Sequence, residues 1–165
     1  MSSTEGEIYP MAMFPTFEVA DIRESIDWYT NVMGFVLIYE MPEPDGKAYI
    51  AHVRKDRHQD IMLIGRSEGK YDDVVKKGAG VSITFQFAGS DDGPQLSIDD
   101  YASQIRGAGA NVLEGPVNRP WNTRELIVAD PDGYRLIFSA PGREAIKKDF
   151  SETMNKVRGS LFKSN

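Results

Sequence analysis

Few side chains in this sequence could carry acid, base or nucleophilic chemistry. Cysteine is absent and histidine occurs twice, at His52 and His58, which excludes thiolate catalysis, disulfides and zinc–thiolate sites. We interpret both histidines as structural or solvated side chains, because His52 lies in a predicted strand without an evident carboxylate partner and His58 lies in a charged loop. Glu18 and Asp60 are the other candidate bases. No catalytic residue is assigned.

Two short motifs each allow two interpretations. Asp130-Pro-Asp-Gly133 resembles the start of a calcium loop, but position twelve of that loop is Pro141 rather than glutamate, so the motif predicts a turn between strands. Asn118–Arg124 contains Trp121 between a proline and polar residues. This indole either stacks on a flat or cationic ligand or closes the end of the core. Motifs typical of serine hydrolases, phosphate-binding loops and His-Glu-x-x-His zinc sites do not occur.

Length and composition predict a folded chain that does not bind nucleic acid. The 165 residues suit one domain or two small repeated halves, and 41% hydrophobic residues suffice for a core. The net charge of -6 argues against binding a phosphate backbone and is compatible with a cationic ligand. The apolar runs are too short to cross a membrane, and Met1–Glu7 lacks the features of a secretory signal. We therefore expect a cytoplasmic protein.

The hydrophobic periodicity predicts one order of elements that occurs twice. Each half has a strand, a helix and three more strands, so the expected fold class is α+β, with two β-α-β-β-β modules forming a curved mixed sheet around a cleft. The expected strands are 13–19, 35–41, 48–54, 60–64, 81–87, 111–113, 124–129 and 134–139, and the expected helices are 21–34 and 98–106. The expected divisions are an N-terminal tail (1–11), a first module (12–65), a linker (66–80), a second module (81–141) and an amphipathic C-terminal helix (142–165).

Alternation along the strands separates two faces of the expected sheet. One face is large and apolar and must be covered by the helices; its residues are Phe17, Val19, Ile61, Leu63, Ile83, Phe85, Phe87, Leu136 and Phe138. The other face is mixed, which is typical of a small-molecule site, although plain contact with water is the alternative. The candidate ligand-binding residues are Phe14, Thr16, Glu18, Met62, Ser82, Thr84, Gln86, Arg135 and Ile137 on this face, with Trp121 and Arg124 from the loop.

Several short segments follow one another in the order and spacing of a known family. They are Phe17-Glu-Val-Ala-Asp21, Ser25-Ile-Asp-Trp-Tyr29, Met33-Gly-Phe35, Gly107-Ala-Gly-Ala110, Pro120-Trp-Asn-Thr-Arg-Glu125 and Asp130-Pro-Asp-Gly133. Together they resemble the vicinal-oxygen-chelate superfamily of glyoxalases, bleomycin-resistance proteins and dioxygenases, over about residues 12–140. The resemblance implies two modules that form a cleft. For the bleomycin-resistance branch it also implies a homodimer that sequesters a drug.

The enzymes of this superfamily hold a divalent metal with His, Gln or Glu side chains from four strands. The resemblance places the corresponding positions at Phe14, Met62, Ser82 and Ile137, and a shift of one or two residues would include Asp60. Such a cation needs carboxylate or imidazole donors, which these four residues together do not supply. We therefore expect neither a metal nor another cofactor.

Three functional hypotheses follow. The first is a metal-free protein that binds and sequesters a small molecule, with cationic aromatic antibiotics as the leading class. The second is a lyase, isomerase or oxygenase of the glyoxalase or dioxygenase type, acting on a small metabolite through a metal or with Glu18, Asp60 or His52 as its base. The third is a chain whose surface or C-terminal helix binds another protein.

Overall fold

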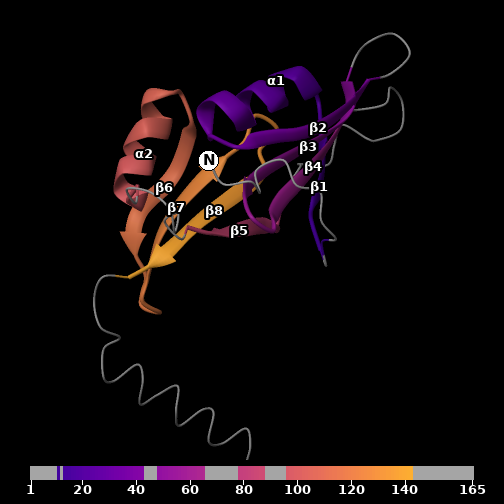
Figure 1. Ribbon diagram of the computed structural model, residues 1–165. Helices are drawn as coiled ribbons and strands as arrows, with labels where there is room; N and C mark the ends of the chain where they lie inside the picture. Colours follow the sequence, from indigo (N-terminus) through magenta and orange to yellow (C-terminus); the bar gives the residue numbers. More distant parts are fainter. Residues whose placement is uncertain (1–10, 12, 43–47, 66–77, 88–95, 143–165) are drawn as a thin grey trace, which may run out of the picture.

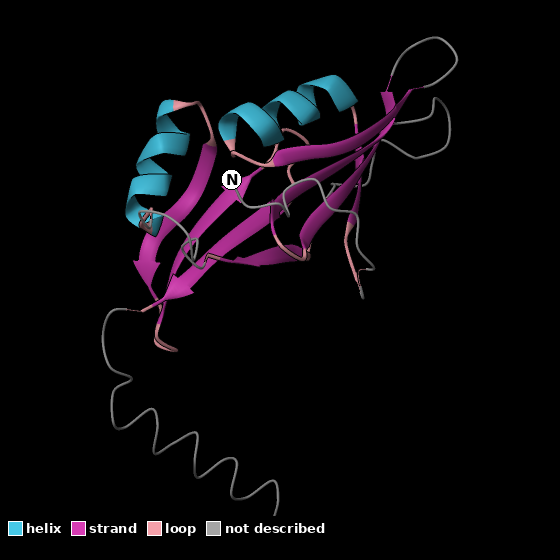
Figure 2. Cartoon of the chain, viewed as in Figure 1, coloured by secondary structure: helices cyan, strands magenta, loops and turns pink. Residues whose placement is uncertain are grey.

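The chain folds into two four-stranded sheets, each with one helix (Figures 1 and 2). The computed structural model describes residues 11, 13–42, 48–65, 78–87 and 96–142. The first module contains β1 (Thr16–Val19), α1 (Ile22–Asp27), η1 (Trp28–Val32), β2 (Val36–Pro42), β3 (Ala48–Asp56) and β4 (Gln59–Gly65). The second contains β5 (Ser82–Gln86), α2 (Ile98–Gly107), β6 (Asn111–Asn118), β7 (Thr123–Ala129) and β8 (Arg135–Pro141). The predicted α+β class and the repeated β-α-β-β-β order are confirmed.

The two sheets have the same topology. Their strand orders are β1-β4-β3-β2 and β5-β8-β7-β6, and in each sheet the first strand of the module pairs in parallel with the last while the other pairs are antiparallel. The crossover from the first strand to the rest of its module is the helix, as parallel pairing requires. A similar fold in both halves therefore follows from the similar periodicity of both halves.

The first helix begins at a carboxylate cap and ends at a glycine. The side chain of Asp21 accepts hydrogen bonds from two backbone N–H groups of the first turn, at 2.9 and 3.1 Å, which satisfies donors that a helix start leaves open. Five residues at Trp28–Val32 then form the wider π-helical turn η1. Gly34, at φ 68°, ends the helix in the left-handed conformation, where a Cβ atom is disfavoured.

The strand β6 is longer than the sequence predicts. It continues to Asn118 instead of ending at Leu113, because the irregular backbone at Gly115-Pro116 is absorbed as a bulge in the pairing with β7. Gly115 has φ 90°, and a Cβ atom there would lie 2.3 Å from the carbonyl oxygen of Glu125. Proline is tolerated because β6 is an edge strand.

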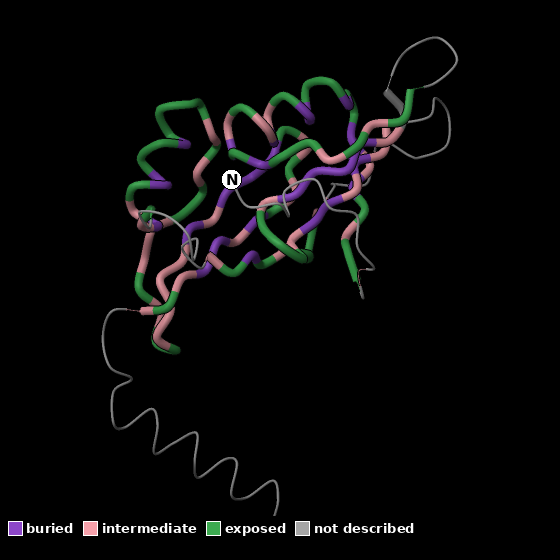
Figure 3. The backbone as a smooth tube through the Cα atoms, in the orientation of Figure 1, coloured by how far each residue is buried: buried purple, intermediate pink, exposed green. Residues whose placement is uncertain are grey.

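One core underlies both helices, and the strands bury alternate residues against it (Figure 3). The apolar face predicted from alternation is confirmed. Its fully buried members include Val19, Ile61, Leu63, Leu136 and Phe138, joined by Tyr29, Met33 and Ile105 from the helical segments. Tyr29, on the first helical segment, is therefore part of the core.

Two hydrogen bonds join the modules at the ends of the outer strands β1 and β5. The backbone N–H of Ala20 donates to Asp132 Oδ1 at 2.9 Å, and Gln59 Nε2 donates to the carbonyl oxygen of Gln86 at 2.8 Å. Asp132 belongs to the Asp130–Gly133 turn, where the N–H of Gly133 donates to the carbonyl oxygen of Asp130 at 3.0 Å, as a strand-joining turn requires. Both helices lie on the same side of the molecule, and the uncovered faces of the two sheets lie opposite them (Figure 1).

Three of the expected segments are not covered. The N-terminal tail except residue 11, linker residues 66–77 and the C-terminal helix from residue 143 lie outside the described residues. Within the described residues, no helix is both long enough and apolar enough to cross a membrane.

Candidate functional site

Each sheet has an open face, which we define as the face opposite α1 or α2. Backbone pairing sets the neighbours on it. The central row of the first sheet is Tyr39, His52, Met62 and Thr16. The central row of the second is Glu114, Ile127, Ile137 and Thr84. In each row the last pair is an apolar residue, Met62 or Ile137, beside a threonine on β1 or β5. The two modules therefore carry the same kind of pair at equivalent positions.

Most of the predicted ligand-binding residues lie on this open face or beside it. The exposed ones are Thr16, Ser82, Thr84, Gln86, Arg135 and, just before β1, Phe14. The half-buried ones are Glu18, Met62 and Ile137. Partly covered apolar side chains among hydroxyl, amide and guanidinium groups make a surface that can contact both the rings and the polar substituents of a small molecule.

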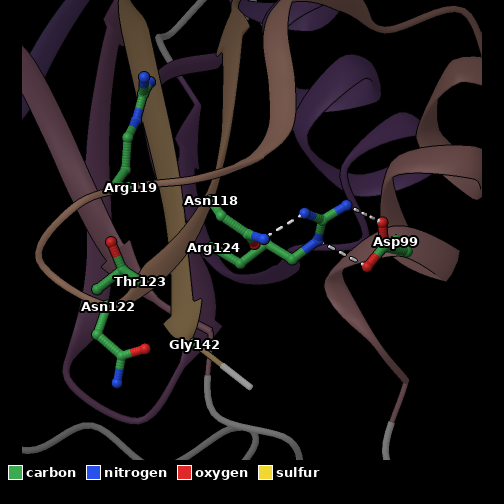
Figure 4. Close-up of a pocket in the computed structure, with 7 residues that line it drawn as sticks. All are labelled: Asp99, Asn118, Arg119, Asn122, Thr123, Arg124 and Gly142. Atoms are coloured by element: carbon green, nitrogen blue, oxygen red, sulfur yellow. Dashed lines mark hydrogen bonds and ion pairs between the residues drawn. The ribbon is translucent and has the colours of Figure 1, made fainter. Parts of the chain in front are cut away.

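Arg124 is not brought together with these residues. It lies on the same side of β7 as the buried Leu126 and Val128 and therefore faces α2. There its guanidinium donates to both carboxylate oxygens of Asp99, at 2.5 and 2.9 Å (Figure 4). These hydrogen bonds raise the pKa of Arg124 above its usual value. Arg124 thus joins β7 to the first turn of α2 on the covered side of the sheet.

Trp121 lies at the turn between β6 and β7 and does not close the core. Its side chain is half exposed, and its Nε1 donates to Glu125 Oε1 at 3.0 Å. Thr123 Oγ1 donates to the same oxygen at 2.9 Å, and Arg119 Nε donates to Oε2 at 3.0 Å. Burial raises the pKa of Glu125, but these three hydrogen bonds outweigh it and leave that pKa below its usual value. Glu125 therefore stays ionised and fixes the orientation of an exposed indole.

Sequence reasoning missed a buried charged cluster on the open face of the first sheet. His52 Nε2 lies 2.6 Å from Asp60 Oδ1, and Arg54 Nε donates to the same oxygen at 2.7 Å. All three residues are buried, and His52 is the neighbour of Met62 in the central row. The expectation that His52 has no carboxylate partner is wrong. Since a carboxylate only accepts, the hydrogen of this bond is carried by His52 Nε2.

Comparison with known proteins identifies the family. Residues 15–138, which span all eight strands except the end of β8, match the model of the "Glyoxalase/Bleomycin resistance protein/Dioxygenase superfamily". The chain belongs to this superfamily. The predicted resemblance is thereby confirmed.

Relatives of the glyoxalase/bleomycin-resistance superfamily match most of the chain. The uncharacterised protein Mb0911c of Mycobacterium bovis is 26% identical over 148 residues, which cover 87% of this chain and 92% of that protein. TioX from Micromonospora sp. ML1 has a TM-score of 0.57 at 20% identity, covering 78% of this chain and 97% of that one. TnmS3, an antibiotic binding protein from Streptomyces sp. CB03234, has a TM-score of 0.55 at 20% identity, covering 82% and 100%. At these identities the structural matches establish the fold alone.

The residues at the superfamily's metal positions do not fit a divalent cation. Backbone pairing places Thr16 beside Met62 and Thr84 beside Ile137. Thr16 and Thr84 lie two residues after Phe14 and Ser82 and face the same side of their strands. Neither set contains a carboxylate or an imidazole, which such a cation requires. Among the described residues, no group of three or more His, Asp or Glu side chains could hold a metal.

Proposed function

We propose that this protein binds a small organic molecule on the open face of its two sheets, without a metal, and sequesters it unchanged. The observation that carries the proposal is the content of the positions where the resemblance places the superfamily's metal, which are Phe14, Met62, Ser82 and Ile137. The strand pairing adds Thr16 beside Met62 and Thr84 beside Ile137. These groups offer hydrogen bonds and apolar contact in place of coordination. The proposed binding residues are Phe14, Thr16, Glu18, Met62, Ser82, Thr84, Gln86, Arg135 and Ile137.

The proposed ligand class is a flat aromatic antibiotic, including cationic ones. Met62 and Ile137 supply adaptable apolar surface, and Glu18 supplies a negative charge near the boundary between the sheets. The chain also carries a net charge of -6, which raises the local concentration of cationic molecules. TnmS3, which shares the fold, is an antibiotic binding protein, and this supports the class without fixing the molecule.

We further propose that the protein acts as a cytoplasmic homodimer. The edge strand β2 exposes Leu37, Tyr39 and Met41 by 37 to 44%, and an apolar edge strand favours pairing with another chain. Sedimentation analysis should give a dimer, and Tyr39→Lys should shift it towards monomer. A monomer for the unaltered protein at binding-assay concentrations would contradict this part of the proposal.

A thermal-shift screen tests the binding proposal directly. The panel contains cationic aromatic antibiotics including bleomycin, divalent metals, and a chelator. A ligand at about 100 times its Kd stabilises the folded state by about 2.7 kcal/mol, which raises Tm by several degrees. We expect such a shift for at least one antibiotic and the same shift in the presence of chelator. A fall in Tm with chelator alone, or saturable stabilisation by a metal, would overturn the metal-free proposal.

Variants locate the site once a panel member binds. Thr84→Ala and Ile137→Asp on the open face should weaken binding, by about tenfold and by more than tenfold respectively, because one removes a hydrogen bond and the other places a charge in the apolar contact. Glu40→Gln is the matched control, since Glu40 bonds to Arg23 of α1 on the covered face. Equal weakening by all three changes would contradict a site on the open face.

One observation favours an enzyme as the second candidate. The hydrogen bond between His52 and Asp60 orients the imidazole beside Met62, which is the arrangement of a general base with its supporting carboxylate. Lyases and isomerases that move a proton beside a carbonyl need such a group. If His52→Gln abolished turnover of an α-hydroxy-carbonyl or dicarbonyl metabolite and left antibiotic binding unchanged, the enzymatic function would be favoured. Absence of turnover in the unaltered protein would argue against it.

A further inference from the structure

A cavity of about 500 Å³ lies away from the proposed open-face site, where β6 ends, β7 begins and β8 ends (Figure 4). Among the described residues its walls are almost entirely polar side chains. They are Asp99, Asn118, Arg119, Asn122, Thr123 and Arg124, with Gly142 completing the wall. Arg124 and Asp99 lie on the α2 side of the strands, whereas Thr123 shares the side of Glu125, so the cavity extends around the strand ends.

The charged side chains at this cavity are paired with one another within the protein. Arg124 donates to both oxygens of Asp99, and Arg119 donates to Glu114 at 2.8 and 3.0 Å and to Glu125 at 3.0 Å. Two guanidinium groups thus face three carboxylates. The carboxylates outnumber the guanidinium groups, and a phosphate or carboxylate ligand would also have to displace one of these ion pairs, so the electrostatics disfavour an anionic ligand.

The uncharged wall residues keep hydrogen-bonding capacity. Asn118 gives its amide oxygen to Arg124 Nη1 at 2.9 Å, and no acceptor among the described residues takes its N–H donors. The side chain of Asn122 likewise has no hydrogen-bond partner in the described part of the chain, although its backbone carbonyl accepts from Gly142 at 2.9 Å. Amide groups both donate and accept, as does the hydroxyl of Thr123. Such groups match ligands that carry several hydroxyls.

An exposed aromatic ring lies beside this wall. Trp121 Nε1 and Thr123 Oγ1 donate to the same oxygen of Glu125, so the edge of the indole is fixed next to Thr123. We propose that the cavity is a second binding site for a neutral, hydroxyl-rich ring, of the class of a pyranose sugar or a cyclic polyol. The amides of Asn118 and Asn122 bind its hydroxyls, and Trp121 contacts its apolar C–H edge. This site does not depend on the ligand proposed for the open face.

Two-dimensional NMR of the indole N–H groups tests the site, because the chain has two tryptophans and the second, Trp28, packs against the core. The probes are methyl glucopyranoside, methyl mannopyranoside and myo-inositol, with inorganic phosphate as the charged comparison. We expect at least one neutral probe to move the Trp121 signal saturably, with a Kd in the millimolar range, and to leave Trp28 unmoved. Phosphate should have a smaller effect. Trp121→Phe assigns the two signals.

The matched variants are Asn122→Gly and Gln104→Ala. Asn122 has φ 63°, so glycine removes its amide without straining the backbone, and we expect binding to weaken about tenfold. Gln104 is an exposed amide on α2 outside the cavity wall, and its loss should leave the Kd unchanged. The proposal is overturned if no neutral probe moves Trp121, if phosphate binds more tightly than every neutral probe, or if Asn122→Gly binds as the unaltered protein does.

Discussion

The two ends of the boundary between the modules are built alike but carry opposite charges. At one end, Tyr29 from the first module donates from its hydroxyl to Asp130 Oδ2 at 2.9 Å. At the other end, Tyr101 from the second module and Lys55 both donate to the carbonyl oxygen of Met33 at 2.8 Å, and Lys55 Nζ lies 4.2 Å from the centre of the Tyr101 ring. Each helical segment thus lends a tyrosine to the opposite module.

Burial acts on the two charges in opposite directions. It raises the pKa of Asp130 to about 6 and lowers the pKa of Lys55 to about 8. At each end the protein disfavours the ionised form, which costs free energy. Because both shifts disfavour the ionised form, the charges of Asp130 and Lys55 do not stabilise the boundary between the modules. It is held by the aromatic residues between them, where Phe85 packs against Phe35 and Phe138.

Removing the central aromatic residue is the strongest way to break the boundary. Phe85 is buried, with ring centroids 5.6 Å from Phe35 and 5.4 Å from Phe138. Phe85→Ala should lower the free energy of unfolding by about 3 to 5 kcal/mol, because a large cavity is left. Urea denaturation measures this. Thr84→Ala, the exposed neighbour on the opposite face of β5, should change it by less than about 0.5 kcal/mol. Similar losses for both would contradict an aromatic centre.

The acidic end should make the protein less stable as pH rises from about 4 to about 6. Because burial raises the pKa of Asp130 in the folded protein above its ordinary value of 3.8, the native state holds a proton that the unfolded chain has released. The contribution is therefore present below pH 3.8 and lost as pH passes 6, and it amounts to about 3 kcal/mol. Asp130→Asn should remove this decline. An unchanged pH profile in the variant would place the titration elsewhere.

The hydroxyl groups of Tyr29 and Tyr101 should contribute unequally to the stability of the boundary between the modules. Tyr29→Phe removes a hydrogen bond to a buried carboxyl group and should cost about 2 kcal/mol, whereas Tyr101→Phe should cost about 1 kcal/mol because Lys55 still donates to the carbonyl of Met33. Denaturant midpoints of the two variants rank the losses. The opposite order would mean that the Tyr101 end holds the modules together more firmly.

The fold could be predicted because alternation and capping residues act locally. Asp21 begins its helix and Gly34 ends it as expected, and the strand faces follow from every second residue being apolar. The length of β6 could not be predicted, because the bulge at Gly115 depends on how closely its backbone packs against the backbone of Glu125. The π-helical turn Trp28–Val32 likewise carries no signal in the hydrophobic pattern.

For the candidate site, the sequence predicts on which face of a sheet a residue lies, but not which side chains it contacts. Alternation with Val53, Ile61 and Leu63 places His52 and Asp60 on one face. Their contact depends on the pairing register, which sets Arg54 opposite Asp60 and makes His52 its diagonal neighbour, at 2.6 Å. Arg124 had a usable signal, because it alternates in step with Leu126 and Val128 and so had to face the helix. Its Asp99 partner, 25 positions away, is fixed only by tertiary packing.

The basic end should give the smallest effect, with the opposite sign to the acidic end. Burial lowers the pKa of Lys55 in the folded protein from its ordinary value of 10.5 to about 8. The unfolded chain therefore holds a proton that the native state releases, and stability rises with pH above 8. Burial raises the pKa of Tyr101 well above its ordinary value, so tyrosine ionisation in the unfolded chain reverses the trend above about pH 10. Between these limits we expect a gain of about 1 kcal/mol in the free energy of unfolding, reduced by the partial exposure of the side chain. Lys55→Met should abolish that rise, whereas a rise that persists in the variant would show that the ammonium group stays charged against the Tyr101 ring.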